Sequence, residues 1–428
     1  MSKAQRAVFP TSMLMVVVIL AFWVSSLSGM DGNNHTATST SQTQTSQTQT
    51  SQTHTSSRAN WLHTSGIKIF NEASQEVVFN GISTMVLFGY EPPTFPSPTY
   101  DESRMDEARS HGINLIRLEI GFSSSVYGIP ASQQTPTSLT YNVGFFPALD
   151  RLVNECTKVG LWVNICFVMG SMSPIGGAWS SAKGAGVGFP TWMYDQSWSY
   201  FNKYYPNTAV GLSDAIRDFW NINDPTAANV RTAYQTWWKD IAYHFKNAPN
   251  VIFGLWNEPQ CGGGETIWGG TGQPTQVQGA QMYKTFVEQT VDIIQAVAPN
   301  HLIFQNDAYF WYWSTNPKID RPNIVVENHA YTRIDQYSDP VDNPTNDPMY
   351  FINLGWRYNQ PFFLGEFGGI EEGNLQDRAG TIHNMQFCNS LGVSWSYLSF
   401  RPFGGTWNPS AQTWIDIENN LHPNLKYF

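Results

Sequence analysis

Two glutamates each follow a run of apolar residues that has the composition of a buried strand. Residues 251–256 lead directly into Asn257 and Glu258, and residues 361–365 lead directly into Glu366. If the two strands lie on opposite sides of one barrel, their terminal carboxyl groups face each other across its mouth. An acid and a carboxylate about 5 Å apart are the groups that cleave a glycosidic bond with retention of configuration. Glu258 and Glu366 are therefore predicted to be a catalytic pair.

Strand-like and helix-like patterns alternate from about residue 60 to the C-terminus, which is typical of a parallel sheet wrapped by helices. Strands are predicted over residues 83–88, 113–120, 161–168, 251–256, 301–305, 324–328, 361–365 and 392–398. A hairpin is predicted over residues 66–81, and helices over residues 101–110, 147–159, 227–246, 277–298 and 375–390. Eight such units predict an α/β fold, a (β/α)8 TIM barrel that forms a single catalytic domain with its site at the carboxyl ends of the strands. A doubly wound open sheet is the alternative, but no G-x-G-x-x-G or phosphate-loop motif opens a helix.

A long segment after the third predicted strand, residues 169–211, is rich in Gly, Trp and Tyr and is expected to overhang the catalytic face. Indole rings supply area for stacking on the apolar faces of sugars. Six tryptophans in predicted loops are candidates for this role: Trp179, Trp192, Trp198, Trp268, Trp311 and Trp313. Together they favour a long cleft and internal cleavage of a polymer.

The composition favours an uncharged partner. Charged residues make up 13% of the chain, against about 25% in an average soluble protein. The net charge is -10, and no Lys and Arg cluster offers the phosphate contacts that nucleic acids require. A β-linked polysaccharide such as cellulose, β-glucan or mannan is the expected partner, nucleic acid is not, and the chain is expected to act as a monomer.

The N-terminal 59 residues are not expected to form part of the barrel. Residues 1–30 have basic residues, then an apolar stretch over about 13–27, then small residues, which is the order of a secretory signal cleaved near Ser28. An uncleaved membrane anchor is the alternative, although the stretch falls short of the about 20 apolar residues that span a bilayer. Residues 31–59 form a Ser/Thr/Gln-rich linker with a five-residue SQTQT repeat. We expect the domain over 60–428 to be secreted, or anchored at the cell surface.

The four cysteines, Cys156, Cys166, Cys261 and Cys388, have no C-x-x-C spacing and no histidine at metal-ligand spacing. Neither a metal nor another cofactor is therefore expected. An even count in an exported protein permits one or two disulfides, whereas the apolar surroundings of Cys156, Cys166 and Cys388 fit free buried thiols equally well.

The segments LWNEPQ (255–260) and LGEFGG (364–369) resemble the acid/base and nucleophile motifs of glycoside hydrolase family 5. The resemblance extends from about residue 67 to the C-terminus. It implies a retaining, endo-acting enzyme with Glu258 as acid/base and Glu366 as nucleophile. Predicted strand 161–168 departs from the family pattern because it lacks the histidine that family members usually carry near its end.

The resemblance also implies roles for substrate-binding residues. Arg117 is similar to the family arginine that supports the nucleophile, and an ion pair with Glu119, two residues along the strand, is the alternative. Asn257 corresponds to the asparagine that binds the sugar 2-hydroxyl. His329 and Tyr331 resemble the family's His-x-Tyr pair, and their spacing places both on one face of a strand.

Trp395 matches the tryptophan that forms the floor under the sugar next to the cleaved bond, and buried packing is the alternative. The other carboxylates in these segments are expected to be structural or surface residues: Glu119, Glu327, Glu371 and Glu372.

The resulting hypothesis is a secreted endo-β-1,4-glucanase without a cofactor. Within the same class the alternative is an endo-β-1,4-mannanase, because the two polymers differ only in the orientation of a hydroxyl group. Outside it, the alternative is a surface carbohydrate-binding protein without turnover, which would need aromatic residues but no opposed carboxylates.

Overall fold

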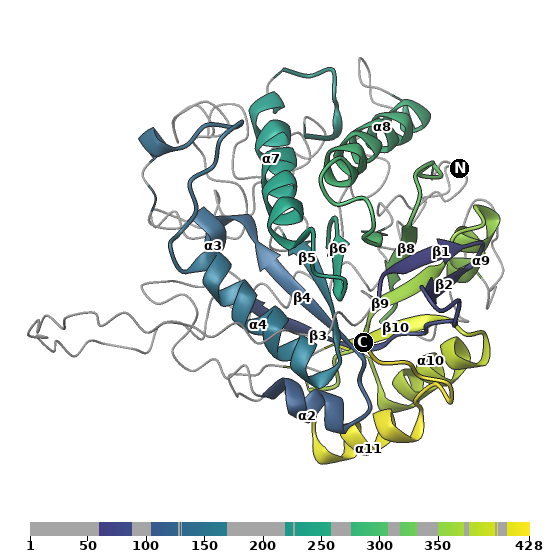
Figure 1. Cartoon of the computed structure of the whole chain (residues 1–428). Coiled ribbons are helices and arrows are strands. Elements are labelled where there is room, and N and C mark those ends of the chain that lie inside the picture. The colour runs from purple at the N-terminus through teal and green to yellow at the C-terminus, as the bar shows by residue number, and fades with distance from the viewer. Residues whose placement is uncertain are drawn as a thin grey trace, which may run out of the picture. The chain divides into compact units, whose positions relative to one another are not determined.

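Eight parallel strands pair side by side into a closed barrel (Figure 1). In spatial order they are β3 (Asn80–Leu87), β4 (Leu115–Gly121), β5 (Trp162–Val168), β6 (Val251–Gly254), β7 (Ile303–Asn306), β8 (Ile324–His329), β9 (Phe362–Gly368) and β10 (Ser394–Leu398). Strand β10 pairs back with β3 and closes the barrel. The predicted (β/α)8 barrel is confirmed, and all eight strands overlap their predicted ranges.

The computed structural model describes one unit, which begins at Asn60 and ends at Phe428. The described residues within it are 60–87, 104–126, 129, 131–168, 219–225, 227–257, 275–306, 317–331, 350–371, 376–398, 400 and 409–428. The predicted signal or anchor, the linker and the long segment after the third barrel strand lie outside these residues. No helix among the described residues is both long enough and apolar enough to cross a membrane.

Five helices lie where the sequence predicts them: α2 (Met105–Ser110), α4 (Phe145–Val159), α7 (Ala228–Phe245), α8 (Gln276–Gln295) and α10 (Arg378–Ser390). The ends of two of them follow local chemistry. Thr275 and Gln278 form a capping box at the start of α8, and Gly160 takes the left-handed conformation that ends α4. Among the described residues, four short helices were not predicted: α3 (Phe122–Val126), η2 (Ala131–Gln133), α9 (Tyr350–Arg357) and α11 (Ala411–Asn419).

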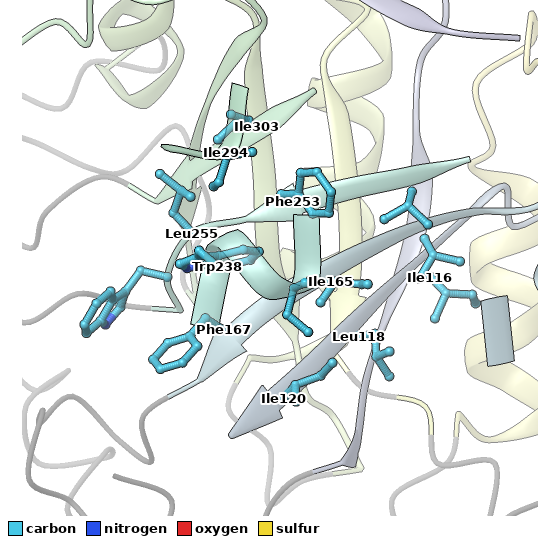
Figure 2. Packing of buried hydrophobic residues seen from close by; sticks show 14 of the residues in the cluster. Ile116, Leu118, Ile120, Ile165, Phe167, Trp238, Phe253, Leu255, Ile294 and Ile303 are labelled. Atoms are coloured by element: carbon cyan, nitrogen blue, oxygen red, sulfur yellow. The ribbon is translucent and has the colours of Figure 1, made fainter. Parts of the chain in front are cut away.

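One face of each strand packs against the helices. Figure 2 shows this for β4, whose Ile116, Leu118 and Ile120 point the same way at alternate positions. They share one buried cluster with residues of the surrounding helices, including Trp238 of α7. Because strand side chains alternate between faces, the residues between them point into the barrel.

The barrel interior is apolar at the amino ends of the strands and polar above. A second buried cluster fills the lower part and consists of Phe79, Leu115, Trp162, Ile252, Leu302, Phe304, Val325 and Phe363, with Leu62, Ile69 and Val77. Leu62 and Ile69 come from the hairpin of β1 (Leu62–Ser65) and β2 (Lys68–Asn71), so this hairpin covers the lower end. Above this floor, the strand register aligns Ser83, Arg117 and Asn164, and the interior becomes polar.

Cys156, Cys166 and Cys388 are buried free thiols. Of the two alternatives left open by the sequence, the structure therefore supports free thiols for these three residues. Cys261 lies outside the described residues.

Candidate active site

Arg117 of β4 is the centre of a buried polar network and has no exposed surface. Its Nε donates to Glu327 Oε1 at 2.8 Å, and its Nη1 donates both to Glu119 Oε1 at 2.6 Å and to Glu366 Oε1 at 2.9 Å. Its Nη2 donates to Asn257 Oδ1 at 2.6 Å. A single guanidinium thus connects residues of β4, β8 and β9 with Asn257, which lies three residues after the end of β6. Arg117 contacts Glu366, as the resemblance predicts, and also Glu119, as the alternative predicts.

The second carboxylate oxygen of Glu366 is held from the other side. Its Oε2 accepts a hydrogen bond from the Tyr331 hydroxyl and lies 3.4 Å from His329 Nδ1. The other ring nitrogen of His329, Nε2, lies 3.1 Å from Asn306 Nδ2 at the end of β7. Both oxygens of Glu366 are therefore fixed, which sets the orientation of the carboxylate in the barrel.

A bulge in β9 turns Glu366 into the barrel. Leu364 and Phe367 both belong to the helix-facing cluster, and the two residues between them point inward. Pairing with β10 jumps from Leu364 to Phe367, which marks the extra residue. Without it, strict alternation from Leu364 would direct Glu366 toward the helices. The bulge thus determines whether the glutamate reaches the site at all.

The inward face of the bulge also needs a glycine. A Cβ atom on Gly365 would lie 2.1 Å from Glu327 Oε1, so Gly365→Ala must displace that carboxyl group from Arg117. We expect the variant to lose about 1–3 kcal/mol of unfolding free energy because it overpacks the interior. We also expect a loss of about tenfold or more in kcat/KM, because a shifted Arg117 misplaces Glu366. Urea denaturation and hydrolysis rates measure both effects.

Shortening the displaced side chain provides the control. In a Glu327→Ala background the atoms that clash are gone, so adding Gly365→Ala should cost much less than it does in the wild type. Fully additive losses would show that the clash with Glu327 is not the cause.

Glu366 and Glu119 both accept a hydrogen bond from Arg117 Nη1, but their pKa values shift in opposite directions. Burial alone would raise the pKa of Glu366, but attraction to His329 and Arg117 and hydrogen bonds from Tyr331 and Glu119 lower it overall. For Glu119, burial and the neighbouring charge of Glu366 raise the pKa well above its usual range, against the attraction of Arg117. Glu366 is therefore ionised at neutral pH, the form that a nucleophile requires.

Asn257 is the last described residue before the predicted acid/base. Its backbone N–H donates to the carbonyl oxygen of Phe167 at 2.7 Å, which anchors the chain just beyond the end of β6. Glu258 follows Asn257 directly but lies outside the described residues. So do the six loop tryptophans and Glu372.

Metal ions in proteins are held by several His, Cys, Asp or Glu side chains around one point. Among the residues that the structure describes, no three His, Cys, Asp or Glu side chains are placed to hold a metal ion together. The positive charge between the carboxyl groups of the network is that of the Arg117 guanidinium.

Trp395 lies away from the network, so its predicted role as the floor under a sugar is wrong. Its side chain belongs to the helix-facing cluster and meets Phe367 at 5.7 Å between ring centroids. Its indole N–H donates to Asn389 Oδ1 of α10 at 2.9 Å, and the residue has no exposed surface. On either side of it, Ser394 and Ser396 take the inward positions. Buried packing, the alternative, is the correct interpretation.

Three site residues were missed or undervalued. Glu119 and Glu327 were expected to be structural or surface residues, and Asn306 was not considered. The two glutamates lie two residues from Arg117 and His329, on the same strand faces, and this spacing is the signal that could have identified them. For Glu371 the expectation of a structural role holds, since it accepts hydrogen bonds from the Tyr397 hydroxyl and the Ser410 N–H.

Known proteins resemble this chain in sequence and in fold. An endoglucanase of Paenibacillus polymyxa is 24% identical over 402 residues, which cover 82% of this chain and 85% of that protein. Among solved structures, an endogalactoceramidase superposes with a TM-score of 0.59 at 16% identity, covering 84% of this chain and 78% of the other. Endo-glycoceramidase II from Rhodococcus sp., in a cellobiose-like imidazole complex, gives 0.58 at 19% identity, covering 83% and 81%.

At these identities the structural matches show a shared fold. The sequence carries the family relationship: the model of cellulases, glycosyl hydrolase family 5, matches residues 70–404, which include all eight barrel strands and the whole network around Arg117. This chain belongs to glycosyl hydrolase family 5.

Proposed function

We propose that this chain is a secreted, retaining endo-β-1,4-glucanase that hydrolyses internal bonds of cellulose or a soluble β-glucan. The observation that carries the proposal is the placement of Glu366: it is buried at the carboxyl end of the barrel, both of its oxygens are held, and these contacts lower its pKa. Such a carboxylate is suited to attack an anomeric carbon. The similarity to an endoglucanase over most of both chains supports a glucan as the substrate.

The proposed reaction has two steps. Glu258 protonates the oxygen of the leaving sugar while Glu366 forms a bond to the anomeric carbon, which gives a covalent glycosyl-enzyme. Glu258 then removes a proton from a water molecule, whose oxygen displaces Glu366 with a second inversion. Arg117 and Tyr331 hold Glu366 in line throughout, because they donate to different oxygens of its carboxylate.

Asn257 supplies the contact with the sugar in this proposal. Its Oδ1 accepts from Arg117, which leaves the Nδ2 group to donate to the 2-hydroxyl of the sugar that is being cleaved. A hydrogen bond to this hydroxyl strengthens as the oxocarbenium-like transition state forms.

A substrate panel tests the proposal. Reducing-end release is measured from carboxymethylcellulose, glucomannan, mannan, xylan and laminarin, and from a β-glycosylceramide because two structural relatives carry that substrate in their names. We expect carboxymethylcellulose to be cleaved fastest, with the β-anomer as the first product seen by NMR. Faster release from mannan would favour the mannanase, cleavage of the lipid alone would favour a glycolipid hydrolase, and binding without release would favour the carbohydrate-binding alternative.

A further inference from the structure

Glu119 shares one guanidinium nitrogen with Glu366. Arg117 Nη1 donates to both carboxyl groups, at 2.6 Å and 2.9 Å, and Glu119 is only 2% exposed. Glu327 takes the Nε of the same arginine. Three carboxyl groups therefore surround one arginine, and none of these glutamates is more than 5% exposed. Because Glu119 and Glu366 share one guanidinium nitrogen, two negative charges there would repel each other in a buried site.

The pattern of donors identifies which of the two groups on Nη1 is neutral. Glu366 receives Arg117 on one oxygen and the Tyr331 hydroxyl on the other, with His329 Nδ1 at 3.4 Å. Glu119 receives only Arg117 among the described hydrogen bonds, and it is within hydrogen-bonding reach of Glu366 itself. A hydrogen bond between two carboxyl groups needs one proton, and that proton belongs on the member with fewer donors.

We propose that Glu119 is a positioning residue for the nucleophile: it stays uncharged and donates its carboxyl proton to Glu366. Its carbonyl oxygen still accepts from Arg117 Nη1, so one arginine hydrogen-bond donor orients both groups. The pair then carries one negative charge, located on Glu366, and that charge is stabilised by Arg117, Tyr331 and Glu119. This inference rests on the proposed role of Glu366.

The groups that face Glu119 come from four strands. Arg117 on its own strand and His329 on β8 favour its ionised form, whereas burial and Glu366 on β9 favour its protonated form and prevail. On β5, burial raises the pKa of the Cys166 thiol well above its usual range, so it adds no charge at neutral pH. The pKa of Glu119 is raised well above its usual range as a result.

Glu119→Gln tests the proposal, because an amide donates the same hydrogen bond at every pH and carries no charge. The acid limb of the kcat/KM profile reports the ionisation of the free enzyme's nucleophile. We expect this limb to stay within about 0.3 pH unit of the wild type in Glu119→Gln. In Glu119→Leu it should move up by about one unit, because Glu366 loses a donor. If Glu119 is instead ionised, Glu119→Gln removes a negative charge beside Glu366 and the limb moves down by about one unit, which overturns the proposal.

An infrared difference spectrum provides a readout that does not depend on hydrolysis. At neutral pH the wild type should show a carboxylic-acid C=O stretch that disappears in Glu119→Gln. A spectrum without that loss would contradict a neutral Glu119. Since this readout is spectroscopic, it separates failure of the present inference from failure of the proposed function, which Glu366 variants test.

Glu371→Gln is the matched control. Burial would raise the pKa of Glu371, but hydrogen bonds from the Ser410 N–H, Thr413 and Tyr397 lower it, so Glu371 is ionised. The same chemical change outside the network should therefore remove no carboxylic-acid band and leave the acid limb in place. Loss of such a band in this variant would invalidate the assignment of the band to Glu119.

Discussion

Glu366→Gln is expected to reduce hydrolysis of an aryl β-cellobioside by about 10⁴-fold or more, because the amide cannot form the glycosyl-enzyme. The substitution keeps the shape of the side chain and an oxygen that can accept from Arg117 Nη1. We therefore expect the barrel to remain folded, with binding of the glucan close to that of the wild type. Steady-state kinetics measures the loss of hydrolysis, a thermal melt on the same preparation measures whether the fold is retained, and a binding assay measures the affinity for the glucan. Activity close to that of the wild type would refute the role of Glu366.

When added azide restores the activity of an alanine variant, the configuration of the glycosyl azide product distinguishes the roles of Glu366 and Glu258. In Glu366→Ala, added azide can occupy the space of the lost carboxylate and attack the anomeric carbon, which yields an α-glycosyl azide. In Glu258→Ala, the covalent intermediate still forms on Glu366, and azide then displaces it to yield a β-glycosyl azide. The opposite assignment of products would exchange the two roles.

The eight strands could be predicted because each is an apolar run bounded by polar or turn residues, and this pattern is local. The face of the strand on which a side chain lies is harder to predict, because a shift of the strand by one residue moves every side chain to the other face. Trp395 shows the consequence: it lies between two inward serines, and the sequence gives no sign that it packs against α10 instead. Glu366 was placed correctly, although the bulge that turns it inward was not visible in the sequence.

Apart from the contact between Arg117 and Glu119, the network depends on residues that lie far apart in the chain. The hydrogen bond from Arg117 to Glu327 joins residues 210 positions apart, and only closure of the barrel brings them together. Buried carboxylates are rare unless they are paired, so Glu119 and Glu327, each considered alone, were interpreted as structural or surface residues. The short helices α3 and α9 were missed because they contain only five and eight residues, fewer than the roughly 11 residues over which helical periodicity can be read from a sequence.

Arg117→Met is expected to have the largest effect on stability. It leaves Glu366 and Glu327 in a buried site without their common cation, and breaking such a buried pair costs about 3–5 kcal/mol of unfolding free energy. Hydrolysis should fall as well, because Glu366 loses both a donor and its orientation. Arg321→Met is the matched control: Arg321 pairs with the exposed Asp292, and such surface pairs contribute about 0–1 kcal/mol.

The pH dependence of this loss has a definite sign. In the wild type the pKa of Glu366 is lowered by folding, so its contribution to stability is present above its unfolded pKa and is lost as the pH falls. Without Arg117, burial is expected to dominate and raise that pKa above the unfolded value. The contribution is then present at low pH and is lost as the pH rises. Urea denaturation of both proteins at about pH 5 and pH 8 should therefore show a smaller gap in unfolding free energy at the lower pH. A gap that widens toward low pH would mean that Arg117 does not stabilise the fold through an ionised Glu366.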